Sequence, residues 1–251
     1  MPHPINRIVL ISITVILLGV LLSIDPIAQD PAYYNFVDNR DWLGVSNAWN
    51  VLSNLGFIVV VMLRFAPYRQ KQHGSDLHAY VTLFMLGVFF TAFGSAWFHW
   101  NPTTATLVWD RLPMTIAFSS FFLSVWHDYI SARVRYWLWP VVLFSAATVF
   151  YWYWTETLGR GDLRPYIVVQ FLPILLLPFI LWLYTQKAIQ PRPIFMALGF
   201  YILAKLAEMF DGAIYELTEQ IISGHSVKHL LAAVAAYYIL LAYQPKADTT
   251  P

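Results

Sequence analysis

Eight apolar runs, each close to the length of a membrane-spanning helix, occupy most of this 251-residue chain. A helix needs about 20 mostly apolar residues to cross the hydrocarbon core of a bilayer. Only 12% of the residues are charged and 59% are hydrophobic, whereas soluble domains carry about 25% charged residues. The sequence therefore predicts an all-α, polytopic membrane helix bundle. The runs cover residues 5–24, 49–65, 78–99, 110–126, 136–154, 167–184, 194–211 and 227–243.

The first run has two interpretations. Arg7 precedes a long apolar stretch, as in a signal peptide, but Pro26-Ile27-Ala28 is a poor match to a small-residue cleavage site. We therefore expect residues 1–25 to form an uncleaved anchor helix, with a signal peptide as the alternative. Residues 26–251 are expected to form one domain of seven spans, because the connections between the runs are short.

The distribution of Lys and Arg between the runs predicts the orientation, because cytoplasmic loops are enriched in both. One side of the membrane collects nine of them, which places both termini in the cytoplasm. The opposite side is mostly acidic and is expected to face the periplasm, exterior or lumen. The nine residues are Arg7, Arg64, Arg69, Lys71, Arg133, Arg135, Lys187, Arg192 and Lys246.

Four ionisable residues, distant in sequence, fall at one predicted depth near the outer face. His99 ends the third run, Asp110 opens the fourth, and His225 and His229 stand at the start of the eighth. Residues four apart on a helix share a face, so both late histidines can reach one metal ion. Ionisable groups at membrane depth are costly and indicate a functional site.

These residues have the composition of a zinc hydrolase site. The chain has no cysteine, so imidazole and carboxylate must hold any transition metal. A catalytic zinc takes three protein ligands and leaves one position for water, and His99, His225 and His229 supply three. Asp110 is the candidate general base and then acid, and Ser95, one turn before His99, is a candidate partner for the water or an oxyanion. The H-x-x-x-H spacing alone would also suit haem or a transport path.

Other polar residues have roles that the sequence leaves open. Asp211 could orient a ligand histidine, and Lys205 and Glu208 could form an internal ion pair. Asn50, Ser53 and Asn54 share one face of the second run, where hydrogen bonds between helices are favoured over contact with a substrate head group. His127 and Asp128 lie at the inner end of the fourth run, about 30 Å of hydrocarbon away from the outer histidines.

The pattern resembles a superfamily of membrane hydrolases that includes alkaline ceramidases, Per1-like proteins and adiponectin-receptor-like proteins. The shared signature is Ser95-x-x-x-His99, then Asp110, then His225-x-x-x-His229. Residues 110–114, Asp-Arg-Leu-Pro-Met, look like the D-E-L-P-M stretch of alkaline ceramidases, and residues 49–54 look like their W-N-x-x-S-N stretch. The resemblance covers about residues 38 to 243.

The resemblance implies a seven-helix bundle in which zinc, held by three histidines, serves the hydrolysis of ceramide to sphingosine and a fatty acid. The additional first span departs from that plan. Calcium regulation, known for eukaryotic members, is in doubt here because Arg40 lies within the acidic segment at residues 38–47 and carboxylates are fewer. The expected substrate is ceramide or a related N-acyl lipid.

Other functions remain as alternatives to the amidase. A Per1-like ester lipid hydrolase would use the same zinc chemistry, and an adiponectin-receptor-like receptor would hold zinc for structural reasons. A transporter is disfavoured because the polar groups gather at one depth. A net charge of +1 with no dense basic block gives no reason to expect a nucleic-acid partner. The sequence does not determine the oligomeric state.

Overall fold

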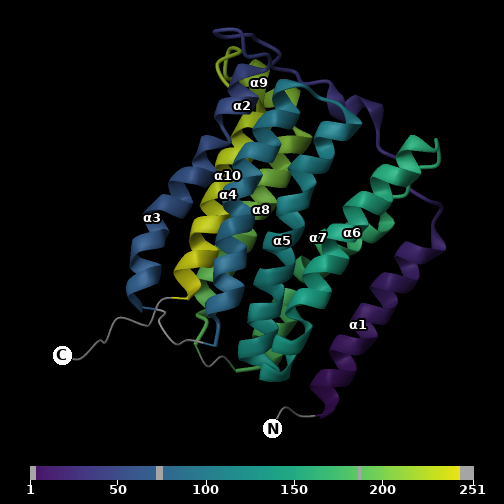
Figure 1. The fold of residues 1–251 in the computed structure, drawn as a ribbon, viewed down its shortest axis with the longest axis vertical. Coiled ribbons are helices and arrows are strands. Elements are labelled where there is room, and N and C mark those ends of the chain that lie inside the picture. Colours follow the sequence, from purple (N-terminus) through teal and green to yellow (C-terminus); the bar gives the residue numbers. More distant parts are fainter. Residues whose placement is uncertain (1–3, 72–75, 186–187, 244–251) are drawn as a thin grey trace.

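The computed structural model describes residues 4–71, 76–185 and 188–243, and within these ranges the chain is all-α with no strand, as predicted (Figure 1). Long helices run side by side in alternating directions, and short helices and loops close the two ends of the bundle. Lys187 and Lys246, used above to predict the orientation, lie outside the described residues. The α-helices are α1 (Pro4–Ser23), α2 (Ala48–Leu52), α3 (Leu55–Lys71), α4 (His78–Trp100), α5 (Thr104–Tyr129), α6 (Leu138–Thr157), α7 (Arg164–Leu183), α8 (Pro191–Met209), α9 (Asp211–Leu217) and α10 (Gly224–Ala242), with the 3₁₀ helices η1 (Pro31–Tyr34) and η2 (Ala132–Trp137).

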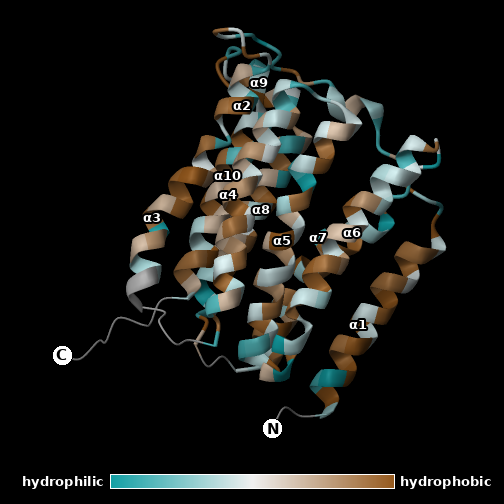
Figure 2. Ribbon diagram, in the orientation of Figure 1, coloured by the Kyte–Doolittle hydropathy of each residue, from teal (hydrophilic) through white to brown (hydrophobic). Residues whose placement is uncertain are grey.

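This is an integral, multi-pass membrane protein. Six helical segments among the described residues are long and apolar enough to cross a bilayer, and the bent pair α8 and α9 makes a seventh. Hydrophobic residues predominate along α1 (Figure 2), and both α1 and α3 expose large hydrophobic side chains, as lipid contact requires. The remaining predicted run, residues 110–126, belongs to α5, which has 26 residues but does not meet the same test of composition. Its buried polar side chains, including Asp110, Arg111 and Ser120, face the interior of the bundle.

Two predicted runs are interrupted in the structure. The run at 49–65 divides between α2 and α3 at Ser53 and Asn54. The run at 194–211 ends at Met209, because the chain turns by 82° before α9 begins at Asp211. Asp211 therefore starts a short helix at the end of the bundle, two residues after the last residue of α8.

Side-chain caps fix the starts of α5, which carries Asp110, and of α10, which carries His225 and His229. Thr103 and Thr106 form a reciprocal capping box at the start of α5. Asp110 lies six residues after Thr104, the first residue of this helix. The Ser223 hydroxyl accepts a hydrogen bond from the Ser226 main-chain N–H at the start of α10. Such caps satisfy N–H groups that have no partner within the helix. Each of these helices thus starts at a residue that a side-chain hydrogen bond fixes.

Gly94 allows α4 and α5 to approach closely. A Cβ atom at this position would overlap the main-chain carbonyl of Trp109, so a larger residue would push the two helices apart. The next residues on each helix are Ser95 and Asp110. The close crossing therefore brings two of the predicted site residues together.

Helix α1 lies at the edge of the bundle and packs mainly against α7 (Figure 1). Asn6 Nδ2 donates a hydrogen bond to the Leu183 carbonyl near one end, and Arg164 Nη1 donates to the Ile24 carbonyl near the other. Arg164 also pairs with both carboxylate oxygens of Asp162, which lowers the pKa of that carboxyl. The prediction of residues 1–25 as a separate anchor remains a prediction.

Candidate metal centre

Three histidines from two helices meet at one end of the bundle. His99 lies in the last turn of α4, and His225 and His229 lie in the first turns of α10. All three are buried, and their nearest ring nitrogens lie within 4.8 Å of one another. His99 Nε2 is 3.1 Å from His229 Nε2 and 3.4 Å from His225 Nε2. The structure thus brings together all three residues that the sequence singled out as ligands.

These distances fit a single bound metal ion. Zinc lies about 2.0–2.1 Å from each histidine nitrogen, so two tetrahedral ligands are about 3.3 Å apart. Both nitrogen distances to His99 are close to this value. The cluster could therefore hold a transition metal, and its all-nitrogen donor set suits zinc among several metals.

Ser53 fixes the orientation of one candidate ligand. Its hydroxyl donates its only hydrogen to the Asn50 carbonyl and lies 2.8 Å from His229 Nδ1. We therefore assign the Nδ1 proton to His229, which donates it to Ser53 and leaves the Nε2 lone pair for a metal. A partner on the second ring nitrogen is characteristic of metal-binding histidines. The sequence predicted a hydrogen bond between helices for Ser53, and the structure shows that its partner is a candidate metal ligand.

Phe36 covers the cluster on one side. Its ring centroid lies 4.7 Å from that of His99 and 5.1 Å from that of His225. The Asn47 side chain holds the end of α4 by donating a hydrogen bond to the His99 carbonyl. Phe36 comes from an irregular segment after η1, so no helical periodicity in the sequence could have indicated it.

Asp211 contacts the main chain of a candidate ligand. Its Oδ1 atom accepts a 2.7 Å hydrogen bond from the His225 N–H, at the start of α10. The carboxylate thus fixes where the helix begins and, with it, the place of His225. Any effect of Asp211 on a metal would act through this main-chain contact, and not through the imidazole.

Asp110 and Ser95 face each other beside the histidines. Both line a cavity of about 240 Å³ that His229 also lines, between α4, α5, α7, α8 and α10. The Ser95 side chain lies near enough to interact with the Asp110 carboxyl. The spacing predicted that these groups share one depth, and the structure places them in one cavity.

A chain of charged groups joins the cavity to the histidines. Glu208 accepts hydrogen bonds from Lys205 at 2.7 Å and from Lys228 at 2.9 Å. The sequence predicted the first ion pair, which the structure confirms, but not the second. Lys228 Nζ also lies 2.9 Å from His225 Nε2. A metal ion on that nitrogen would take the lone pair that now accepts the lysine hydrogen bond.

Tyr33 reaches the same cavity from η1. Burial raises the pKa of its phenol, the nearby carboxylates Glu208 and Asp110 raise it further, and Arg111 and Lys205 oppose them. The phenol is therefore protonated at neutral pH. Tyr33 can serve the cavity as a hydrogen-bond donor, but not as a base.

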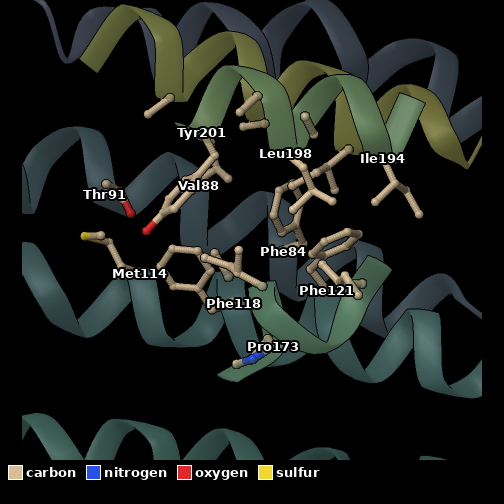
Figure 3. A pocket seen from close by; sticks show the side chains of 18 of the residues that line it. Phe84, Val88, Thr91, Met114, Phe118, Phe121, Pro173, Ile194, Leu198 and Tyr201 are labelled. Carbon is tan, nitrogen blue, oxygen red and sulfur yellow. The ribbon is translucent and has the colours of Figure 1, made fainter. Parts of the chain in front are cut away.

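An apolar chamber of about 140 Å³ lies deeper in the bundle. Thr91, Met114 and Tyr201 line both spaces, so the polar cavity adjoins the apolar chamber directly. These three residues lie at one end of the chamber, and Phe121 and Ile194 lie towards the other (Figure 3). An amphiphile with its polar part near the histidines could place an acyl chain along this path.

The remaining polar residues of the sequence analysis lie outside this cavity. Asn50 accepts a hydrogen bond from the Ser226 hydroxyl, which confirms its predicted role between helices. Asp38 accepts two hydrogen bonds from the Arg40 guanidinium, one on each carboxylate oxygen, so calcium would have to displace this partner. His127 and Asp128 lie about 27 Å along α5 from Asp110, given about 1.5 Å per residue.

Comparison with known protein families and with characterised proteins finds no match for this chain. The resemblance to alkaline ceramidases therefore depends on the residues themselves. The supported description is a multi-span helical membrane protein with a buried cluster of three histidines that could bind a metal ion.

Proposed function

We propose that this protein is a zinc-dependent amidase of the membrane, which hydrolyses ceramide or a related N-acyl lipid to a fatty acid and a free amine. The observation that carries the proposal is the convergence of His99, His225 and His229 at metal-ligand distances beside Asp110. Zinc held there would polarise the acyl carbonyl and lower the pKa of a water molecule to about 7.

Each neighbouring side chain has a role in this chemistry. Asp110 accepts a proton from the attacking water and returns it to the leaving nitrogen, so the C–N bond breaks as the amine is protonated. Ser95 donates a hydrogen bond to the oxygen that gains negative charge. Ser53 and Asp211 act as positioning residues, through His229 Nδ1 and the His225 main chain respectively.

The two adjoining cavities support a lipid substrate. The polar cavity contains the reacting groups, and the apolar chamber beyond Thr91, Met114 and Tyr201 suits an acyl chain. With this arrangement the amide would lie near the end of the bundle that the distribution of Lys and Arg places at the outer leaflet. We propose that both termini are cytoplasmic and that the site faces the periplasm, exterior or lumen.

Asp110→Asn in purified protein tests the mechanism. We expect zinc content to stay near one ion per chain while amide hydrolysis falls to background, because the amide side chain cannot accept the proton. Asp25→Asn is the matched control, since it makes the same chemical change at an exposed residue outside the cavity. Unchanged turnover in Asp110→Asn would remove Asp110 from the mechanism.

Paired amide and ester lipids with one acyl chain separate this proposal from the alternatives. Faster release of fatty acid from the ester would favour the Per1-like hydrolase. Zinc binding with no turnover of either lipid would favour a receptor in which the metal is structural.

A further inference from the structure

The cavity beside His229 contains more positive than negative side chains. Arg111, Lys205 and Lys228 line it, against Asp110 and Glu208. A metal ion on three neutral imidazoles adds positive charge to the same space. Uncompensated charge in a membrane interior is costly, so an excess of this sign favours an anionic ligand.

The two lysines share one carboxylate. Lys205 Nζ pairs with one oxygen of Glu208 and Lys228 Nζ with the other, so a single negative charge serves two ammonium groups. A structural ion pair would need only one of the lysines. The second leaves a net positive charge between α8 and α10, at the wall of the cavity.

Arg111 adds a further charge that no carboxylate pairs with in the part of the chain that the structure describes. The residue is 7% exposed, and its Nη2 atom donates a hydrogen bond to the neutral Gln29 side chain at 2.5 Å. Its guanidinium carbon lies 4.2 Å from the centre of the Trp152 ring and 4.9 Å from that of Tyr166. These aromatic rings hold the guanidinium in place without neutralising it.

We propose that the substrate carries an anionic group, a phosphate or a carboxylate, on the amine side of its amide, and that Lys205, Lys228 and Arg111 bind it. Guanidinium and ammonium groups are the usual partners of both anions. The protonated phenol of Tyr33, which lies among these charges, supplies a further hydrogen-bond donor. This inference rests on the proposed amidase function and narrows its substrate from ceramide, which has a neutral head, to a related N-acyl lipid with an anionic head.

Three lipids that share a palmitoyl amide test the proposal in the zinc-loaded protein. N-palmitoylethanolamine has a neutral head, N-palmitoylglycine a carboxylate, and N-palmitoyl phosphoethanolamine a phosphate, and each releases palmitate on hydrolysis. We expect kcat/KM to be at least about 10-fold higher for one or both anionic lipids, because desolvated charge pairs discriminate strongly. The preferred anion identifies the head group.

The outcomes separate this inference from the proposed function. Equal or faster hydrolysis of the neutral lipid would overturn the inference and leave the amidase proposal intact. Release of no palmitate from any of the three would count against the amidase. Binding of the same lipids to Asp110→Asn protein, measured by native mass spectrometry, decides the head-group preference even then, and equal binding would overturn it.

Lys205→Gln connects the preference to the cavity. We expect the ratio of kcat/KM between the anionic and neutral lipids to fall about fivefold or more, and Lys205→Arg to restore most of it. Arg133→Gln is the matched control, since it removes an exposed positive charge from η2 at the opposite end of the bundle. An unchanged ratio in Lys205→Gln would contradict the role of the lysine.

Discussion

The two ends of the bundle use the same residue types in different ways. At one end His99, His225 and His229 meet beside Asp110, with their Nε2 atoms directed at one another. At the other end, His127 and Asp128 have their partners within the protein. His127 Nδ1 lies 3.2 Å from the Tyr80 hydroxyl, and the Asp128 carboxylate accepts hydrogen bonds from the main-chain N–H groups of Ala188 and Ile189.

This difference separates a candidate metal site from a structural one. A polar group whose hydrogen bonds are filled by the protein contributes to stability and has little capacity left for a ligand. The nitrogens of three clustered imidazoles, in contrast, cannot all satisfy one another. Whether a buried histidine or aspartate can bind a ligand therefore depends less on the residue type than on how many of its hydrogen bonds the protein already fills.

Removal of one candidate ligand should have the largest effect. In His99→Gln we expect metal content to fall from about one ion per chain to nearly none, because two nitrogens remain where a catalytic zinc needs three protein ligands. Hydrolysis should be lost with it. His127→Gln makes the same change at the opposite end and should keep the metal, as measured by elemental analysis. If both variants lost metal equally, the comparison of the two ends would be wrong.

A smaller loss of metal binding is expected when a candidate ligand keeps its imidazole but loses the hydrogen bond that orients it. Ser53→Ala removes the hydrogen-bond partner of His229 Nδ1, and we expect metal affinity to fall about 10- to 100-fold. Competition with a chelator of known affinity measures the change. Ser120→Ala is the control, since that hydroxyl donates to the Ile116 carbonyl within its own helix. Equal affinities in both variants would show that Ser53 does not support the site.

The smallest effect on metal binding, and a distinct effect on stability, is expected at the opposite end. Asp128→Asn replaces one acceptor oxygen with a donor that faces the N–H groups of Ala188 and Ile189. We expect unfolding to become easier by about 1–3 kcal/mol, the cost of leaving a buried group unsatisfied. Metal content should not change. Loss of metal without loss of thermal stability would reverse the assignment of the two ends.

The helices and the convergence of the histidines followed from local patterns. Apolar runs of membrane length predicted the long helices, and the spacing of four placed His225 beside His229 and Ser95 beside His99. The alternating direction of successive spans then brought the ends of three runs to one depth. The structure confirms that the three histidines come together, while their role as zinc ligands remains a prediction.

Sequence reasoning fell short where the pattern within one segment does not show a break in a helix or a contact with another helix. The run at 194–211 is mostly apolar and its few charged residues mark no break, so hydropathy could not show the 82° turn before Asp211. The sequence also could not show that the polar side chains of α5 are turned to other helices. Lys228 offered a signal that was overlooked, since it lies three residues after His225 on the same face.

The sequence by itself determined that the chain is a membrane helix bundle with a conspicuous set of histidines at one level, because the cost of exposing backbone and charge to lipid acts on each segment separately. Only the tertiary structure decided which groups support that set and what lies beside it. Ser53, Phe36, Glu208 and the crossing at Gly94 depend on contacts between segments distant in sequence. Such contacts depend on how helices pack, which no pattern within one helix records.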